Sequence, residues 1–353
     1  MDGNVFCDRE IIIKEARSPA LSIVTAFFDA RAPLAVLLES LLRSHFMDFE
    51  VCLCDDGSRD GGMDVAMSFA DRLRIKAVRH DKNLGVTATR NSALALAGAP
   101  LLLFLDADVR IRPDTINHLL ETQRRTQADV ISGIYSDTAL DPGFWSGYYA
   151  LFVHHSFLVC DEPTPYNVFN GWCALARREV MDKLDGHRPT AKGIEIENEA
   201  LGRRIVSQGF RLLLDPRAAV DHHWGGPRKI FFIFTRRVYW WVKIFFATGG
   251  RFEKALTTRG YALGTLAAPA SLACAWAGKP FPAAAALAVF LFAYGPFFIF
   301  AWRRRGPAYA VLCVTASAAL ASVASVSATY SAAEEAARIL VRGQGTLSPA
   351  EFS

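Results

Sequence analysis

The sequence has no Cys-x-x-Cys pair and no zinc-ligand spacing among its seven cysteines. This absence argues against a structural zinc site. Two of the seven, Cys52 and Cys54, lie in a predicted buried strand, as expected for small apolar side chains in a reducing compartment. The N-terminus lacks a signal-peptide pattern, and there is no internal repeat or low-complexity segment of note. The net charge of +4 is too small to indicate a nucleic-acid partner.

Apolar residues, by contrast, are abundant. They make up 52% of the 353 residues, which is a high share for a purely soluble protein. The chain is long enough for one domain of about 200 residues and a further region. The composition changes after Arg228, where long uncharged stretches follow. We therefore expect a folded domain followed by a membrane-associated region.

The most informative stretch is residues 101–108, an apolar run that ends in two carboxylates, Asp106 and Asp108. Five large hydrophobic residues without polar alternation predict a strand that is buried on both faces. Ligands bind beyond the carboxyl ends of such strands, and side chains two residues apart point the same way. Carboxylate oxygens in this arrangement suit Mg²⁺ or Mn²⁺ bridging to a diphosphate. The alternative is a strand that simply stops at a polar turn.

Strand and helix patterns alternate through the first half of the chain. They predict strands over residues 21–28, 49–54 and 75–78 and helices over residues 33–44 and 86–97. This order, with short connections, predicts an α/β fold with a doubly wound mixed sheet and helices on both faces. The polar loops that follow the strands then meet at one edge of the sheet.

Five separate sequence elements stand in a fixed order and spacing. They are Asp55-Asp56-Gly57-Ser58-Arg59-Asp60-Gly61, Asn83-Leu84-Gly85 with Thr89-Arg90-Asn91, Asp106-Ala107-Asp108, the segment 170–178, and Glu197-Asn198 ahead of Gly209. Together they resemble the signature segments of family 2 glycosyltransferases, which have the GT-A fold. The resemblance implies a catalytic domain over residues 19–228 and a nucleotide-diphosphate sugar as the donor.

The resemblance also assigns residues to the nucleotide: Thr25, Phe27, Asp55, Asp56, Arg90 and Asp106. At the tip of its strand, Asp55 can accept from the imide N–H of uracil or an equivalent base edge. Thr25 and Phe27 match positions that line the base pocket, and Asp106 matches the position that contacts the ribose. Arg90, near a helix start, can pair with the diphosphate. For Asp56 the alternative is that it only shapes the turn.

A metal site is implied by the same resemblance. Asp108 matches the aspartate that holds the ion. In related enzymes a histidine after the last strand can join it, and His222 and His223 follow strands predicted over residues 212–214 and 218–220. Imidazole suits Mn²⁺ better than Mg²⁺. We name His222 as the candidate, while strand register decides between the two; a surface histidine pair is the alternative.

The catalytic base departs from the family pattern. The family's Glu-Asp pair falls on Glu197-Asn198, and an amide cannot take a proton at neutral pH. Glu195 and Glu199 lie within a turn of Asn198 on a helix predicted over residues 196–208, so either can substitute, with Glu199 preferred. A phosphomonoester acceptor such as a polyprenyl phosphate needs no base, because it is already an anion at pH 7. An inactive homologue is the third possibility.

Residues 229–258 combine cations with aromatic side chains. Lys229, Arg236 and Lys243 repeat every seven residues, which places them on one side of a helix with Arg237 nearby. A basic stripe against a broad aromatic face is typical of an amphipathic helix in a membrane interface. The alternative is a buried core helix.

Three uncharged stretches follow, over residues 261–278, 281–302 and 307–330. Each approaches or exceeds the roughly 20 residues that cross a hydrocarbon core. We expect a membrane region over residues 259–332, with about three transmembrane helices, and a tail over residues 333–353.

Positive charges predict the orientation of these helices. The arginines at 303–305, with Lys254 and Arg259, should stay in the cytoplasm by the positive-inside rule, and the turn at Lys279 should face outward. With three spans, the short C-terminal tail lies outside. In an alternative arrangement the first two stretches form a re-entrant hairpin, and the tail then lies in the cytoplasm.

Taken together, the sequence predicts a multi-pass, membrane-anchored, inverting glycosyltransferase of the cell membrane with a cytoplasmic catalytic domain. It would use a nucleotide-diphosphate sugar, Mn²⁺ or Mg²⁺, and a lipid-linked or other membrane-associated acceptor in glycan or glycolipid assembly, with membrane lipids as further partners. The competing hypothesis is a non-catalytic nucleotide-sugar-binding membrane protein, for which Asn198 is the main support. Processive polysaccharide synthesis is disfavoured, because there is no clear Gln-x-x-Arg-Trp segment.

Overall fold

The computed structural model of this chain describes residues 11–12, 18–158, 161–188, 196–250, 258–342 and 345–347. The chain divides into two compact units. One is built mainly from residues 1–136 and 160–223, and the other from residues 137–159 and 224–351. The first holds the predicted site, and the second holds the predicted membrane region.

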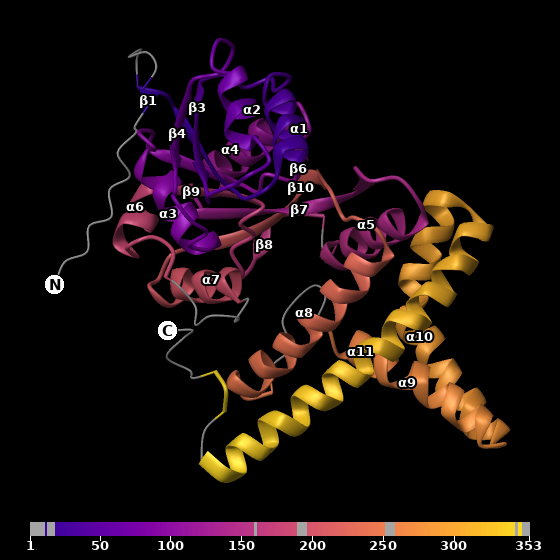
Figure 1. Ribbon diagram of the computed structural model, residues 1–353. Helices are drawn as coiled ribbons and strands as arrows, with labels where there is room; N and C mark the ends of the chain where they lie inside the picture. The colour runs from indigo at the N-terminus through magenta and orange to yellow at the C-terminus, as the bar shows by residue number, and fades with distance from the viewer. Residues whose placement is uncertain are drawn as a thin grey trace. The chain divides into compact units, whose positions relative to one another are not determined.

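The first unit contains a mixed sheet and the helices that cover it (Figure 1). Its strands are β1 (Ile11–Ile12), β2 (Leu21–Phe27), β3 (Phe49–Asp55), β4 (Ile75–Arg79), β5 (Leu101–Leu105), β6 (Val109–Ile111), β7 (Val130–Ala139), β8 (Thr164–Pro165), β9 (Cys173–Arg177) and β10 (Leu212–His222). Its helices are α1 (Arg31–Leu41), α2 (Gly62–Ser68), α3 (Val86–Ala95), α4 (Thr115–Thr126), α6 (Arg178–Lys183) and α7 (Glu197–Ser207).

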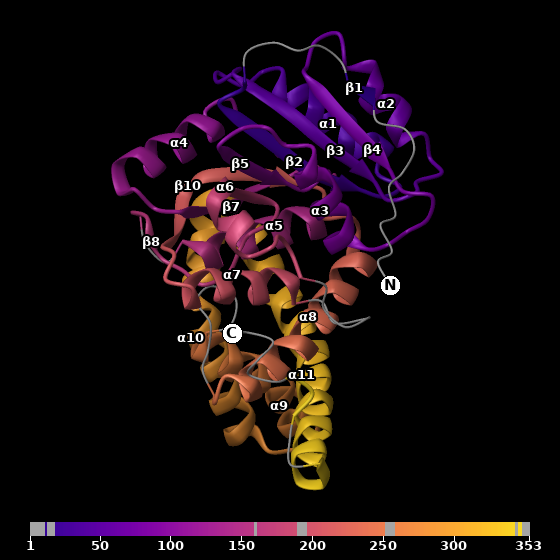
Figure 2. The same cartoon turned by 90° about the vertical axis from the view of Figure 1, so that its left-hand side faces the viewer.

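The order of the strands creates the edge at which a ligand can bind. The sheet runs β1-β4-β3-β2-β5-β9-β7-β10-β6, with β8 paired to β10. Strands β4, β3, β2 and β5 are parallel and lie side by side in Figure 2, whereas β9 joins β5 antiparallel. The chain leaves β2 for β3 and β4 and returns to β5 on the other side of β2, so the topological switch point lies between β2 and β5. The predicted doubly wound mixed sheet is confirmed.

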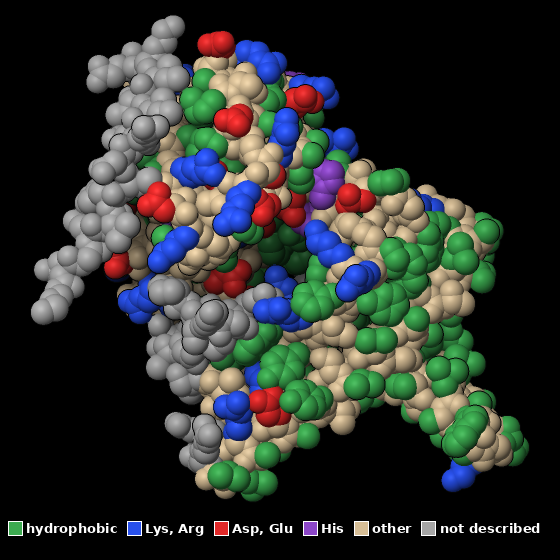
Figure 3. Space-filling view, in the orientation of Figure 1, with side chains coloured by type: hydrophobic (Ala, Val, Ile, Leu, Met, Phe, Trp, Pro, Cys, Tyr) green, Lys and Arg blue, Asp and Glu red, His purple; other side chains and the backbone are tan. Residues whose placement is uncertain are grey.

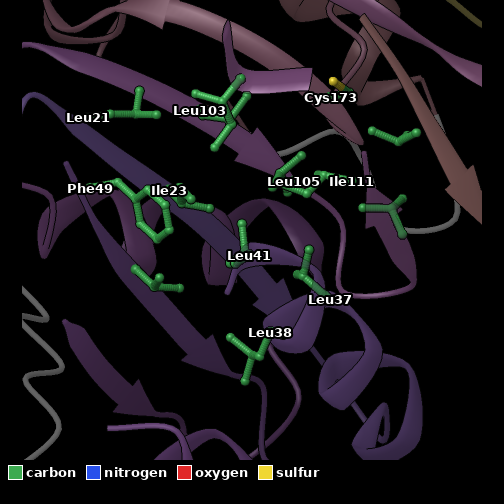
Figure 4. Packing of buried hydrophobic residues seen from close by; sticks show 14 of the residues in the cluster. Leu21, Ile23, Leu37, Leu38, Leu41, Phe49, Leu103, Leu105, Ile111 and Cys173 are labelled. Atoms are coloured by element: carbon green, nitrogen blue, oxygen red, sulfur yellow. The ribbon is translucent and has the colours of Figure 1, made fainter. Parts of the chain in front are cut away.

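The core explains why these segments are strands. Alternate residues of β2 and β5, such as Ile23 and Leu103, pack against Leu37 and Leu41 of α1 (Figure 4). On the opposite side, α3 packs on β2 and β3, and Phe104 of β5 meets the ring of Phe169 edge-on at 5.1 Å. The predicted burial of β5 on both faces is therefore confirmed.

One strand differs from its prediction. The two strands predicted over residues 212–214 and 218–220 form a single strand, β10, that runs through the polar residues between them. Asp215 is fully buried there, and its carboxylate accepts hydrogen bonds from Thr122 of α4 and from Arg217. Because the buried charge is paired, the strand does not have to break.

The second unit is helical. It contains α5 (Phe144–Phe157), α8 (Pro227–Ala247), α9 (Arg259–Trp276), α10 (Pro280–Arg305) and α11 (Pro307–Arg342). Helix α5 lies inside the range 19–228 that we predicted for the catalytic domain, yet it belongs to this unit. The reason is its aromatic surface, since the rings of Tyr148 and Phe152 pack edge-on against Phe297 of α10 at 5.7 and 5.2 Å.

Among the described residues, two helices are long and apolar enough to cross a membrane, α10 and α11. The first predicted span corresponds to α9, which has 18 residues and does not meet the same test. Helix α11 continues past residue 332, where we expected the membrane region to end, to Arg342.

The basic stripe predicted on α8 is wrong at one position. Lys243 is fully buried, and its ammonium group lies 3.1 Å from a carboxylate oxygen of Glu335 and 3.2 Å from one of Glu334. Both carboxylates belong to α11. Lys243 therefore joins α8 to α11 and is not available to lipid head groups.

Candidate active site

The pairing of β6 with β10 brings Asp108 and His222 together. Val109 lies opposite His222 in this antiparallel pair. As a result, His222 Nε2 lies 3.2 Å from Asp108 Oδ2. His223, the other candidate, uses its backbone N–H to bond the Asp108 carbonyl at 3.1 Å. The register therefore brings the imidazole of His222 to the end of the Asp-x-Asp segment.

Arg90 is the second centre of charge at this edge. It is 5% exposed, and its guanidinium donates to Asp106 Oδ1 at 2.8 Å and to Asn198 Oδ1 at 3.3 Å. Burial alone would lower the pKa of Arg90, but the negative charges of Asp106 and Glu197 outweigh this effect and raise it. A permanent cation is thus fixed beside the Asp-x-Asp segment.

A glycine makes room for this arrangement. A β-carbon at position 171 would lie 2.9 Å from Arg90 Nη2 and 2.9 Å from Asn198 Oδ1. Gly171 therefore lets α3 and α7 bring their side chains together in front of β9. The predicted motif over residues 170–178 contains this glycine, but its partners could not be known from the motif.

Two aromatic side chains that we did not predict support the histidine. The ring of Tyr135, from β7, stacks on Trp172 with centroids 4.5 Å apart and meets His222 edge-on at 4.8 Å. Tyr135 and His222 come from different strands and Trp172 lies just before a third, so no local pattern could signal the cluster. The stack restrains the imidazole in front of Asp108.

Asp56 organises a turn. One carboxylate oxygen accepts from His80 and from the Leu84 N–H at 2.8 Å each, and the other accepts from the Gly85 N–H at 2.9 Å. Burial would raise the pKa of Asp56, but these hydrogen bonds prevail and lower it. Both oxygens are thereby engaged in holding the start of α3, the helix that carries Arg90.

The other predicted nucleotide residues lie along β2 and β3. Asp55 is 1% exposed, with one oxygen accepting from the Ser58 N–H at 2.8 Å and the other 3.3 Å from Arg79. Within the described residues, the hydroxyl of Thr25 has no hydrogen-bond partner and is fully buried. Phe27 is 3% exposed in the hydrophobic core, so its contribution here is packing.

Helix α7 carries the candidates for a base. Asn198 and Glu197 are on the side of Arg90. The side-chain oxygen of Asn198 accepts a hydrogen bond from the Arg90 guanidinium, and the negative charge of Glu197 raises the pKa of Arg90. Glu199 acts instead on Tyr166, whose pKa is raised by burial and by this carboxylate. Glu195 lies outside the described residues.

In the described part of the chain, no group of three or more His, Cys, Asp or Glu side chains is arranged to hold a metal ion. The site instead offers a pair, Asp108 and His222. Adjacent ligands of one octahedral ion lie about 3 Å apart when the metal–ligand distance is about 2.1 Å. The 3.2 Å separation of this pair therefore fits two ligands of one ion.

Comparisons with known proteins bear on the family and the fold. Residues 22–185 match the family "Glycosyl transferase family 2". The chain is 42% identical over 105 residues to the validoxylamine A glucosyltransferase of Streptomyces hygroscopicus subsp. jinggangensis, a match that covers 29% of this chain and 25% of that protein. It is 30% identical over 105 residues to the putative glycosyltransferase EpsH of Bacillus subtilis, covering 30% of each. The chain thus spans about a quarter to a third of these relatives.

A solved structure resembles the chain over a longer range. The mannosyltransferase PcManGT from Pyrobaculum calidifontis, in complex with GDP-Man and Mn²⁺, aligns with a TM-score of 0.55 and 18% identity over 89% of this chain and 88% of that one. At this identity the likeness concerns the fold. With the family match, it leads to one conclusion: residues 22–185 of this chain form a family 2 glycosyltransferase domain with the GT-A fold.

Proposed function

We propose that this protein is a metal-dependent, inverting glycosyltransferase that moves a sugar from a nucleotide-diphosphate donor to a membrane-associated acceptor. The single observation that carries the proposal is the Asp108–His222 pair beside the Arg90–Asp106 ion pair, at the switch point of a GT-A sheet. The first pair can hold a cation, and the guanidinium of the second can donate hydrogen bonds to an anion. A diphosphate is the ligand that uses both.

The metal would be Mn²⁺ or Mg²⁺, held by Asp108 and His222. The imidazole favours Mn²⁺ of the two. When bound, such an ion neutralises charge that develops on the diphosphate as it leaves. Asp106 is committed to Arg90 in the described contacts, so we assign Asp106 to positioning that arginine.

The nucleotide base would lie at the tip of β3. One carboxylate oxygen of Asp55 lies 3.3 Å from Arg79 and accepts no hydrogen bond within the described residues, and we propose that this oxygen accepts an imide N–H. Asp56 supports this end of the site from behind, by holding the turn that starts α3.

Transfer with inversion is a single displacement. An acceptor oxygen forms a bond to the anomeric carbon, while the bond from that carbon to the diphosphate breaks and its electron pair leaves with the nucleoside diphosphate. A hydroxyl acceptor must also lose a proton. Asn198 cannot take it. The charge of Glu197 on α7 acts on Arg90, so we propose Glu197 ahead of Glu199 as the base.

A second candidate function needs no base. Asn198 accepts from Arg90 without adding negative charge, so the guanidinium keeps attraction for an anion that an aspartate would cancel. A phosphate on a lipid acceptor is such an anion, and its own oxygen is a nucleophile at pH 7. An asparagine in place of the base is equally compatible with a third alternative, a protein that binds a sugar nucleotide without catalysis.

Anchoring belongs to the proposal as well. Helices α10 and α11 meet the length and hydropathy of membrane spans, and α10 ends in Arg303, Arg304 and Arg305. We propose that these arginines face the cytoplasm of the cell membrane, on the side of the glycosyltransferase domain. A lipid-linked acceptor would be confined to the same surface.

A turnover assay tests the proposed function. The full chain in nanodiscs is incubated with UDP- and GDP-sugars, with Mn²⁺ or with chelator, and release of the nucleoside diphosphate is measured. Metal-dependent release that increases with a polyprenyl phosphate supports the phosphate acceptor, and release that increases only with hydroxyl acceptors supports a side-chain base. Donor binding without release or transfer under any condition would leave the non-catalytic alternative.

A further inference from the structure

The helical unit contains a cavity of about 630 Å³ that the proposed glycosyl transfer does not use. It is lined by side chains of α5, α8, α9, α10 and α11. Its volume falls within the range of about 300–1,000 Å³ that is typical of ligand sites. All of its lining residues belong to the helical unit, so the cavity is a feature of that unit alone.

The walls of the cavity are mainly apolar and disfavour a polar ligand. No charged residue lines the cavity within the described part of the chain. The hydroxyls of Thr265 and Tyr294 bond each other at 3.1 Å, and that of Tyr261 bonds His155 at 3.1 Å. Thr258 accepts from the Tyr261 N–H at 3.3 Å. Since these polar groups are already satisfied and most of the other lining residues are apolar, a sugar or nucleotide would lose more hydrogen bonds with water than it would gain on entering.

The cavity opens onto an apolar surface. Leu266 and Phe246 line it and are nevertheless 54% and 38% exposed. Further large apolar side chains are exposed on the neighbouring helices, among them Trp276 at 93% and Phe292 at 88%. Figure 3 shows such hydrophobic side chains spread over α9 and α10. The helical unit thus exposes large apolar side chains both at the cavity and elsewhere on its helices.

We infer that this cavity binds one hydrocarbon chain of a lipid. Two of the helices that line it, α10 and α11, are the candidate membrane spans, so lipid chains are the apolar molecules that surround it. An empty apolar space of this size would forfeit dispersion contacts along every wall, whereas an alkyl or isoprenoid chain restores them. The inference concerns the chain and not the head group. It rests on the proposed membrane anchoring and not on the proposed glycosyl transfer.

Photo-crosslinking tests the inference. The full chain in detergent is irradiated with palmitic acid that carries a diazirine, and the labelled peptides are mapped. We expect labels on the segments of α8, α9 and α11 that line the cavity. Ala328→Trp places an indole in the cavity and should lower this labelling at least about fivefold, with Ala328→Leu as a milder filling variant.

Val326→Trp is the matched control, because Val326 lies on the same helix, is 72% exposed and does not line the cavity. It should label like the unchanged protein. Two unlabelled competitors distinguish the source of the chain: phosphatidylglycerol for a bilayer lipid and farnesyl phosphate for an isoprenoid carrier. Stronger competition by one of them identifies that source. Mapping on the unchanged chain does not depend on how the variants fold. Labels spread evenly over exposed apolar residues, or equal labelling in Ala328→Trp and Val326→Trp, would overturn the inference.

Discussion

Gly171→Ala perturbs the site through a single methyl group. The added carbon would lie 2.9 Å from Arg90 Nη2, 3.0 Å from its Cζ and 2.9 Å from Asn198 Oδ1. Neither partner can move freely, because Arg90 is 5% exposed and bonded to Asp106, while Asn198 is 6% exposed. The guanidinium must therefore shift away from its present position.

The expected cost follows from these contacts. Overpacking of a filled region costs about 1–3 kcal/mol, and loss of a hydrogen bond to a charged group costs about 1.5–3 kcal/mol. Both costs arise from the same displacement of the Arg90 guanidinium, so they are not added together. We therefore expect the free energy of unfolding to fall by about 2–3 kcal/mol. Donor affinity should fall by about 10- to 100-fold if Arg90 contacts the diphosphate, since about 1.4 kcal/mol corresponds to a factor of ten.

Chemical denaturation and titration with UDP or GDP in the presence of Mn²⁺ measure the two effects. Gly226→Ala is the control, because Gly226 has φ −84° and ψ 179°, and no described atom lies within 4 Å of its added carbon. That variant should behave like the unchanged protein. If Gly171→Ala unfolds and binds nucleotide as the unchanged protein does, the assembly of Arg90 with Asn198 is not what forms the site.

Three further predictions concern the base, the acid response and the topology. If a hydroxyl acceptor is used, Glu197→Gln should lower kcat by about 10²–10⁴ while Glu199→Gln stays near the unchanged rate; unchanged kcat in both variants would exclude a base at either position. Folding lowers the pKa of Asp56, so its contribution to stability is present above about pH 4 and is lost as the pH falls below that value. The stability gap between the unchanged protein and Asp56→Asn, followed by denaturation against pH, should therefore narrow in acid, and a gap that widens would contradict this. After replacement of the native cysteines, a cysteine at Lys279 should react with an impermeant thiol reagent on intact cells and one at Gly306 should not; the reverse pattern would invert the proposed orientation.

The sequence alone predicted a strand correctly where its local pattern agrees with its tertiary environment. Residues 101–105 contain only large apolar side chains, and burial on both faces of a strand is the arrangement that suits them. The strand over residues 212–222 was harder, because Asp215 interrupts its apolar pattern, and its burial uses a hydrogen bond from Thr122, about ninety residues earlier, in addition to those from Arg217. Pairing partners that distant leave no local signal.

The same distinction applies to the site. The order of the motifs predicted which residues stand at the edge of the sheet, and the register of β6 with β10 was needed to show that the His222 ring lies at Asp108. Tyr135 supports that histidine from another strand. Lys243 shows the converse: its seven-residue spacing suggested an exposed stripe, but Glu334 and Glu335 of α11 pair with it inside the unit.

Isothermal titration of UDP and GDP into the full chain, with and without Mn²⁺, tests the central claim most directly. We expect the unchanged protein to bind one of them in a Mn²⁺-dependent manner, and Asp108→Ala to lose that dependence while its unfolding transition stays the same. Asp114→Ala is the matched control, because the side chain of Asp114 is 57% exposed in the same unit and pairs only with the exposed His45 among the described ion pairs. Unchanged Mn²⁺-dependent affinity in Asp108→Ala would contradict the account, because the metal would then be held elsewhere.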